Sequence, residues 1–196
     1  MLVIGWVLGG AFVVLCGAGG SPAAGQRPVA RPVGDRPHVN QLHVSRTDVE
    51  LLMPVVGVRP EQLRDNFNEH RGGGTRSHNA IDILASRGTP VVASVDGTIR
   101  KLFTSRAGGL TIYQFDVDEK RVYYYAHLDR YADELSEGMF VPQGTVIGYV
   151  GTTGNAPPGT PHLHFAIEDL PPTKEWWKGT PVNPYPMLTT RALARP

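Results

Sequence analysis

Cysteine is almost absent from this chain of 196 residues. The single cysteine, Cys16, lies in an apolar N-terminal segment, and every charged side chain follows that segment, beginning with Arg27. The body of the chain therefore has no thiol, which excludes a cysteine nucleophile, a thiolate zinc site and a disulfide framework there. The chain also lacks an excess of positive or negative charge, because it contains 19 Lys and Arg residues and 18 Asp and Glu residues. This balance, without a basic cluster, gives no indication of nucleic-acid binding.

Two common hydrolase motifs are missing as well. Glu69-His70 is not followed by a second histidine at the spacing of H-E-x-x-H, so the helical zinc-protease motif is absent. Neither G-x-S-x-G nor S-x-x-K occurs in the chain. A serine nucleophile therefore has no support from the sequence.

The N-terminal segment is predicted to direct the chain out of the cytoplasm, to the periplasm or cell envelope. Residues 1–24 contain a long apolar run followed by small residues, which is typical of a signal peptide, and Ser21 and Ala23 suit a cleavage site. No Lys or Arg precedes the run, so a retained membrane anchor stays an alternative. Acylation at Cys16 is a third option, although the residue before it, Leu15, is larger than a lipoprotein site prefers.

The remaining chain is predicted to form a linker, one domain and a tail. Residues 25–46 are rich in Pro and Arg and lack periodicity, which indicates a flexible linker, and its His38 and His43 are expected to be solvated. Residues 47–190 are long enough for a single domain with its own core, and 191–196 form a short tail.

Glycine and proline are abundant, at 23 and 17 residues, which favours a turn-rich β protein. Runs rich in aromatic and β-branched residues recur from residue 80 onward, and the apolar stretch 51–58 also resembles a strand. Asp96-Gly97 predicts a hairpin turn, the polar tip 118–120 predicts another, and Pro60 favours a short helical turn. The sequence therefore predicts an all-β fold, an antiparallel two-sheet sandwich.

Histidines and an aspartate recur at three places among these strands. In a straight strand His78 and Asp82 would stand about 13 Å apart, too far to hold one ion. His78 must therefore lie at a bend before the strand that carries Asp82, and the glycine-rich loop 71–77 allows such a bend. Further along, a strand places His162 and His164 on one face, about 6.6 Å apart.

These residues match the donor chemistry of a catalytic zinc site. Two histidines and one carboxylate leave a fourth position for water, and one histidine of the H-x-H pair can be a ligand while its neighbour stands beside the site. Bound Zn²⁺ lowers the pKa of that water to about 7. Amide hydrolysis also needs a proton acceptor and a donor, which His127 and His162 can provide.

The motifs together resemble the lysostaphin/LytM-type zinc metalloendopeptidases, which cut peptides of bacterial cell walls. The resemblance covers roughly residues 52–188. It implies a groove-bearing β fold with a duplicated hybrid motif, and an activity on stem peptides or cross-bridges of peptidoglycan. It also implies one Zn²⁺ held by His78, Asp82 and His164, with His127 and His162 as the general base and the oxyanion-stabilising group.

Two positions depart from the family pattern. Ala80 replaces a glycine, a mild change that leaves the metal site intact. Some members place a tyrosine shortly before the first ligand, where this chain has the glycine-rich stretch 72–74. The loop 151–161 and the tip 118–120 are expected to wall the groove.

Several alternatives stay open at this point. Asn155 suits either a turn or a substrate contact, and Trp176-Trp177 either packing over the sheet or a substrate platform. A second hypothesis for the function of the whole chain is a non-enzymatic LytM-type regulator of other wall hydrolases. A third hypothesis is a lipoyl-like carrier, but such a carrier needs a modified lysine, for which Lys120 is a poor candidate. The partners expected are peptidoglycan peptides, and the expected oligomeric state is a monomer.

Overall fold

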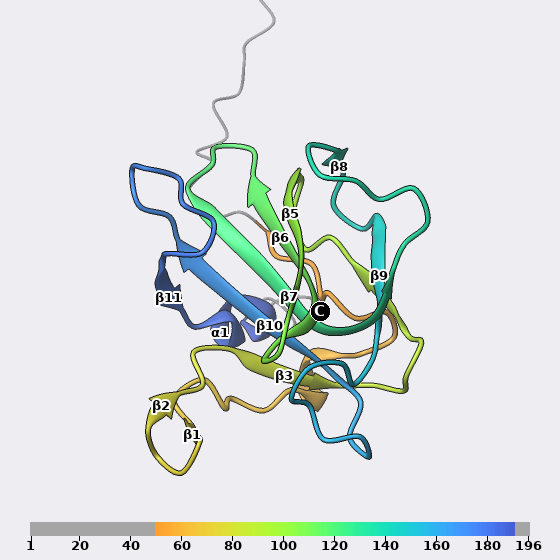
Figure 1. Ribbon diagram of the computed structural model, residues 1–196, viewed down its shortest axis with the longest axis vertical. Coiled ribbons are helices and arrows are strands. Elements are labelled where there is room, and N and C mark those ends of the chain that lie inside the picture. Colours follow the sequence, from red (N-terminus) through yellow and green to blue (C-terminus); the bar gives the residue numbers. More distant parts are fainter. Residues whose placement is uncertain (1–49, 191–196) are drawn as a thin grey trace, which may run out of the picture. The chain divides into compact units, whose positions relative to one another are not determined.

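The computed structural model describes residues 50–190, which form an almost entirely β-stranded body (Figure 1). The predicted leader 1–24, linker 25–46 and tail 191–196 lie outside the described residues. In chain order the elements are the 3-10 helix η1 (Pro60–Gln62), β1 (His70–Arg71), β2 (Arg76–Ser77), β3 (Ile81–Leu84), β4 (Pro90–Val92), β5 (Gly97–Ser105), β6 (Gly109–Asp116), β7 (Arg121–Tyr131), β8 (Phe140–Val141), β9 (Val146–Val150), β10 (His162–Asp169), β11 (Thr180–Val182) and α1 (Pro184–Thr189).

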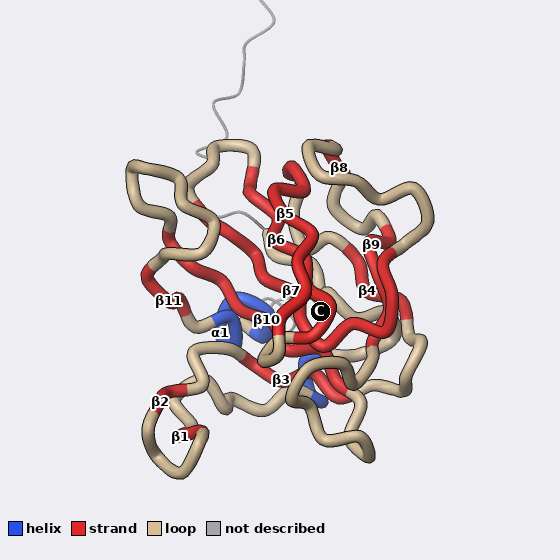
Figure 2. Tube along the Cα trace, in the orientation of Figure 1, coloured by secondary structure: helices blue, strands red, loops and turns tan. Residues whose placement is uncertain are grey.

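Nine strands pair into one antiparallel sheet, and β1 and β2 form a separate hairpin. The main path runs β11-β10-β7-β6-β5-β8, and β3 pairs with the other part of β10. The pair β4–β9, which lies to one side in Figure 2, joins the sheet through the end of β7, where the register shifts between Leu128 and Arg130. The prediction of an all-β antiparallel fold is confirmed.

Side chains alternate between two faces of the strands that form the site. Ile81 and Ile83 of β3 and Phe165 of β10 are fully buried in the core. Because successive residues of a strand point to opposite faces, Asp82 and His164 project from the other side of the sheet. The sequence predicted this alternation. The hydrophobic core packs against one face of these strands, and the polar residues lie on the opposite face.

A buried hydrogen-bond network connects three parts of the sheet behind this face. The Tyr125 hydroxyl donates to Gln114 Oε1 at 2.7 Å and accepts from the Ser94 backbone N–H at 3.0 Å. Gln114 Nε2 in turn donates to the Val95 carbonyl at 2.8 Å. Because Tyr125 and Gln114 are fully buried, each of these groups depends on the others for a partner.

The hairpin predicted at Asp96-Gly97 is wrong. The strand before it, β4, pairs with β9, whereas β5 pairs with β6 and β8. Gly97 serves a close approach instead, because a Cβ there would lie 1.9 Å from the Phe115 carbonyl oxygen. Asp96 accepts the Gln143 backbone N–H at 2.7 Å. Asp96-Gly97 therefore lies in the connection between β4 and β5, which pair with different strands of the sheet.

Other local predictions had mixed outcomes. The stretch 51–58 contributes only an isolated bridge between Val55 and Val91, so the strand predicted there is wrong over most of its length. The helical turn at Pro60 is confirmed by η1, and the tip 118–120 does connect the paired strands β6 and β7. Within residues 50–190, no helix is long and apolar enough to cross a membrane.

Candidate metal centre

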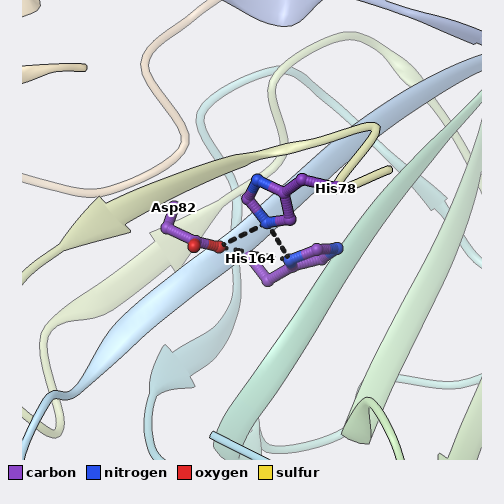
Figure 3. A group of neighbouring side chains, drawn as sticks. All are labelled: His78, Asp82 and His164. Atoms are coloured by element: carbon purple, nitrogen blue, oxygen red, sulfur yellow. Dashed lines mark hydrogen bonds and ion pairs between the residues drawn. The ribbon is translucent and has the colours of Figure 1, made fainter. Parts of the chain in front are cut away.

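Three predicted ligands converge at one point on the polar face of the sheet (Figure 3). His78 Nε2 lies 3.0 Å from both Asp82 Oδ1 and His164 Nδ1. His164 Nδ1 lies 3.2 Å from the same Asp82 oxygen. One donor atom from each side chain therefore faces a shared centre, as a tetrahedral metal site with one open position requires.

The strand register and a bend bring these residues together. His164 of β10 is the direct cross-strand partner of Asp82 of β3, so their side chains lie on the same face. His78 precedes β3, and Asn79 takes the left-handed conformation with φ 56°, which turns the chain. The backbone N–H of His78 donates to the Glu69 carbonyl at 2.8 Å and holds the turn. The predicted bend before Asp82 is confirmed.

Hydrogen bonds select the nitrogen that His78 presents. A carbonyl oxygen can only accept, so the 3.0 Å contact from His78 Nδ1 to the Asn66 carbonyl places a proton on Nδ1, and the longer 3.2 Å approach of Arg71 Nη2 to this nitrogen is then not a hydrogen bond. His78 Nε2 is then left with a lone pair facing Asp82 and His164. A partner of this kind on the second ring nitrogen is typical of metal-bound histidines.

The charge states of the cluster also suit a cation. Burial favours the neutral acid form of Asp82, but hydrogen bonds and charges of His164 and His78 outweigh it and hold the pKa of this carboxyl well below its usual range. Burial lowers the pKa of His164 despite the adjacent Asp82. Metal binding requires the imidazole nitrogens that face Asp82 to present lone pairs, and a cation then takes the place of the protons that these nitrogens share with the carboxylate. The donor set fits Zn²⁺.

His127 and His162 lie beside this cluster. The rings of His127 and His162 are 5.0 Å apart, and the ring of His127 is 5.6 Å from that of His164. His162 Nε2 lies 3.7 Å from Asp82 Oδ1. The structure thus brings all five predicted site residues together, and the two further histidines stand within reach of a substrate at the metal.

Backbone contacts orient both of these histidines. Nδ1 of His127 donates to the Thr153 carbonyl at 2.8 Å, and Nδ1 of His162 donates to the Thr160 carbonyl at 2.8 Å. The Nε2 atom of each ring is thereby left as the acceptor. Burial lowers the pKa of His127 to about 4, so this imidazole is neutral at pH 7 and able to accept a proton. His127 also has a positive φ of 61°, a strained conformation that often occurs at functional sites.

The cluster lies in a cavity of about 460 Å³, a size typical of ligand pockets. Asn155, Pro157 and Thr160 line it, which confirms that the loop 151–161 forms a wall of the groove. The tip 118–120 does not line it, so that prediction is wrong. The tip precedes β7, and His127 lies six residues beyond the first residue of that extended strand, Arg121, which is about 20 Å along the chain.

The two tryptophans also lie outside the lining of this cavity. The Trp176 ring packs 4.6 Å from the Tyr113 ring and 5.6 Å from the Phe103 ring, between ring centroids. Trp177 packs against Trp176 at 5.2 Å and is 61% exposed. These contacts favour packing over the sheet for Trp176.

Sequence reasoning missed three residues of the site. Arg71 donates to Asp82 Oδ2 at 2.6 Å, and Asn66 Nδ2 approaches the same oxygen at 3.4 Å. Tyr124 lines the cavity, and its hydroxyl packs against Gly108, where a Cβ would lie 2.2 Å away. The outward position of Tyr124, between the buried Tyr123 and Tyr125, was available from strand alternation. No motif distinguishes Asn66 or Arg71 from its neighbours.

Comparisons with known proteins agree with this site. The chain is 36% identical over 131 residues to the L-Ala--D-Glu endopeptidase of Bacillus subtilis (strain 168), covering 64% of this chain and 39% of that protein. It is 32% identical over 110 residues to the peptidoglycan DD-endopeptidase ShyC of Vibrio cholerae serotype O1, covering 53% of this chain and 24% of that protein. The chain thus spans well under half the length of these relatives.

A solved structure supports the same relationship. The catalytic domain of the antimicrobial peptidase lysostaphin from Staphylococcus simulans superposes with a TM-score of 0.51 and 30% identity, covering 61% of this chain and 83% of that domain. Residues 76–184, more than half of the chain, match Peptidase family M23 and include the three ligand candidates with both further histidines. The chain is therefore a member of peptidase family M23.

Proposed function

We propose that this chain is a zinc metalloendopeptidase that hydrolyses peptide bonds of peptidoglycan, in stem peptides or cross-bridges. The observation that carries the proposal is the convergence of His78 Nε2, Asp82 Oδ1 and His164 Nδ1 in a cavity that also contains His127 and His162. The names of the relatives, an L-Ala--D-Glu endopeptidase and a peptidoglycan DD-endopeptidase, support the substrate class.

The residues around the cluster suit amide hydrolysis. Zinc bound by the three ligands supplies a Lewis acid and a water molecule of lowered pKa. His127, neutral at pH 7, accepts a proton at Nε2, and Nε2 of His162 is positioned to interact with the developing oxyanion when protonated. The reverse assignment of these two roles fits the same geometry, because both rings have their Nδ1 atoms bound to carbonyls.

The test is digestion of purified sacculi by the zinc-loaded chain. We expect new amino termini to appear, and mass spectrometry of the released fragments identifies the bond. The variant His127→Ala keeps all three ligands and serves as the matched control, since it should bind zinc but release fragments at a far lower rate. Sacculi of several crosslink types that yield no new termini with the zinc-loaded wild type would contradict the proposal.

The site of action is proposed to be the cell envelope. The support is the uncharged apolar run within residues 1–24, which suits either a cleaved signal peptide or a membrane anchor. We further propose that the chain acts as a monomer on peptidoglycan peptides. A non-enzymatic regulator, the alternative function, would stimulate another wall hydrolase while releasing no fragments itself, so the same digestion with and without an added hydrolase distinguishes the two.

A further inference from the structure

Two arginines stand side by side in the wall of the metal cavity. Arg71 of β1 and Arg76 of β2 both line the cavity, and they are direct cross-strand partners in the hairpin. Facing residues of an antiparallel pair have Cα atoms about 5 Å apart and side chains on the same side. Like charges in such a pair destabilise a hairpin. Hairpin stability therefore does not account for this pair.

The two guanidinium groups differ in their partners. Arg71 lies 2.6 Å from Asp82 Oδ2 and 3.4 Å from Glu69 Oε2, so two carboxylates already neutralise it. Arg76 is exposed and forms no ion pair with any residue of the described range 50–190. Among the described residues that line the cavity, Asp82 is the only acid, and Arg71 occupies its outer oxygen. Arg76 is therefore a cation without a counter-ion at the mouth of the site.

The approach to Arg76 is open. The turn of the hairpin, residues 72–75, contains Gly72, Gly73 and Gly74, all with positive φ, which glycine adopts readily. A Cβ added at Gly73 or Gly74 would meet no atom within 4 Å, so these two positions border open space. A substrate segment can thus pass the turn and reach the guanidinium groups behind it.

We propose that Arg76, together with the neighbouring Arg71, binds a free carboxylate of the peptide substrate. A guanidinium group matches a carboxylate with two parallel hydrogen bonds, which makes arginine suited to this recognition. Arg71 contacts a metal ligand directly and Arg76 is one strand away, so the carboxylate belongs to a residue within one or two positions of the scissile bond. The inference rests on the proposed peptidase function and adds a preference for anionic peptides.

The test compares two stem tetrapeptides that differ only in whether one carboxyl group beside the scissile bond is free or amidated. For the full zinc-loaded chain, we expect kcat/KM to be about tenfold higher for the acid than for the amide, as one partly exposed charge-assisted pair provides. Arg76→Gln should bring this ratio close to one, because it slows cleavage of the acid much more than cleavage of the amide. Arg76→Lys should retain part of the preference, and raised salt should weaken it.

Arg64→Gln is the matched control, because Arg64 is also exposed but does not line the cavity. The inference is overturned if the wild type cleaves both peptides equally, or if Arg76→Gln slows both to the same extent. Equilibrium binding of non-hydrolysable acid and amide analogues, measured by calorimetry, makes the comparison without turnover. Tighter binding of the acid without cleavage of any peptide would contradict the proposed peptidase function and still support the carboxylate site, whereas equal binding would overturn the site.

Discussion

Asn66 provides a direct test of how the metal site is held, because it is uncharged and touches two ligands. Its side-chain Oδ1 accepts the Asp82 backbone N–H at 3.2 Å, and its Nδ2 approaches Asp82 Oδ2 at 3.4 Å. Its backbone carbonyl accepts from His78 Nδ1 at 3.0 Å. The substitution Asn66→Ala removes the two side-chain contacts and keeps the carbonyl, so it perturbs the orientation of Asp82 alone.

The expected size of the effect follows from these distances. Both side-chain contacts are at or beyond the long end of the normal hydrogen-bond range, so each contributes toward the lower part of about 0.5–1.5 kcal/mol. Together they amount to about 1.4 kcal/mol of ligand positioning, which corresponds to about a tenfold weaker affinity for zinc. This lies at the lower edge of the roughly 10–100-fold losses seen when partners of metal ligands are removed.

The assay is the zinc dissociation constant of the full chain, measured by competition with a chelator of known affinity. Asn155→Ala is the matched control, since Asn155 also lines the cavity but bonds through its backbone N–H, to the Ala107 carbonyl at 3.0 Å. Thermal unfolding of both variants verifies that they are folded. An Asn66→Ala dissociation constant within twofold of the wild type, or an equal loss in Asn155→Ala, would refute the reasoning.

Three further predictions test the ligands, the core and a half-buried acid. His164→Ala should abolish tight zinc binding in a chelator titration, whereas wild type stripped by a chelator should regain peptidase activity when zinc is restored. Tyr125→Phe should lower the free energy of unfolding by about 2–4 kcal/mol in a urea titration, because Gln114 and the Ser94 N–H lose a shared buried partner; a loss below about 0.5 kcal/mol would show that the network contributes little. Burial raises the pKa of Glu168 above 4.5, so the folded chain holds this proton more tightly than the unfolded chain. The protonated carboxyl therefore contributes to the free energy of unfolding at low pH, and this contribution is lost as the pH rises through the raised pKa. Glu168→Gln should therefore raise Tm at neutral pH and flatten its decline above pH 4.5, and a pH profile identical to that of the wild type would contradict this.

Strand periodicity made much of this site predictable. Alternation along 162–168 placed the two histidines on the face opposite Phe165 and Ile167, which the structure confirms. The length of an extended strand required a bend between His78 and Asp82, and the turn at Asn79 supplies it. Both inferences depend only on neighbouring residues, and local geometry is the part of a fold that a sequence encodes most directly.

Predictions that depended on distant partners were less successful. Asp96-Gly97 has the composition of a hairpin turn, yet the glycine is needed because the Phe115 carbonyl of another strand approaches it. The tip 118–120 does turn the chain, but strand length carries it away from the cavity. In both cases the outcome depends on strands that are distant in the sequence, which the composition of the local segment does not specify.

The sequence by itself determined the all-β class and the polar face of the strands, because alternation depends on residues close together in the chain, and the resemblance of its motifs to a known family indicated the five residues of the site. Only the tertiary structure decided which atoms meet. The register of β3 against β10 sets His164 opposite Asp82, and the folding of 66–71 beside β3 brings Asn66 and Arg71 onto that carboxylate. Hydrogen bonds and ion pairs of this kind require donor and acceptor within about 3 Å, a condition set by long-range packing.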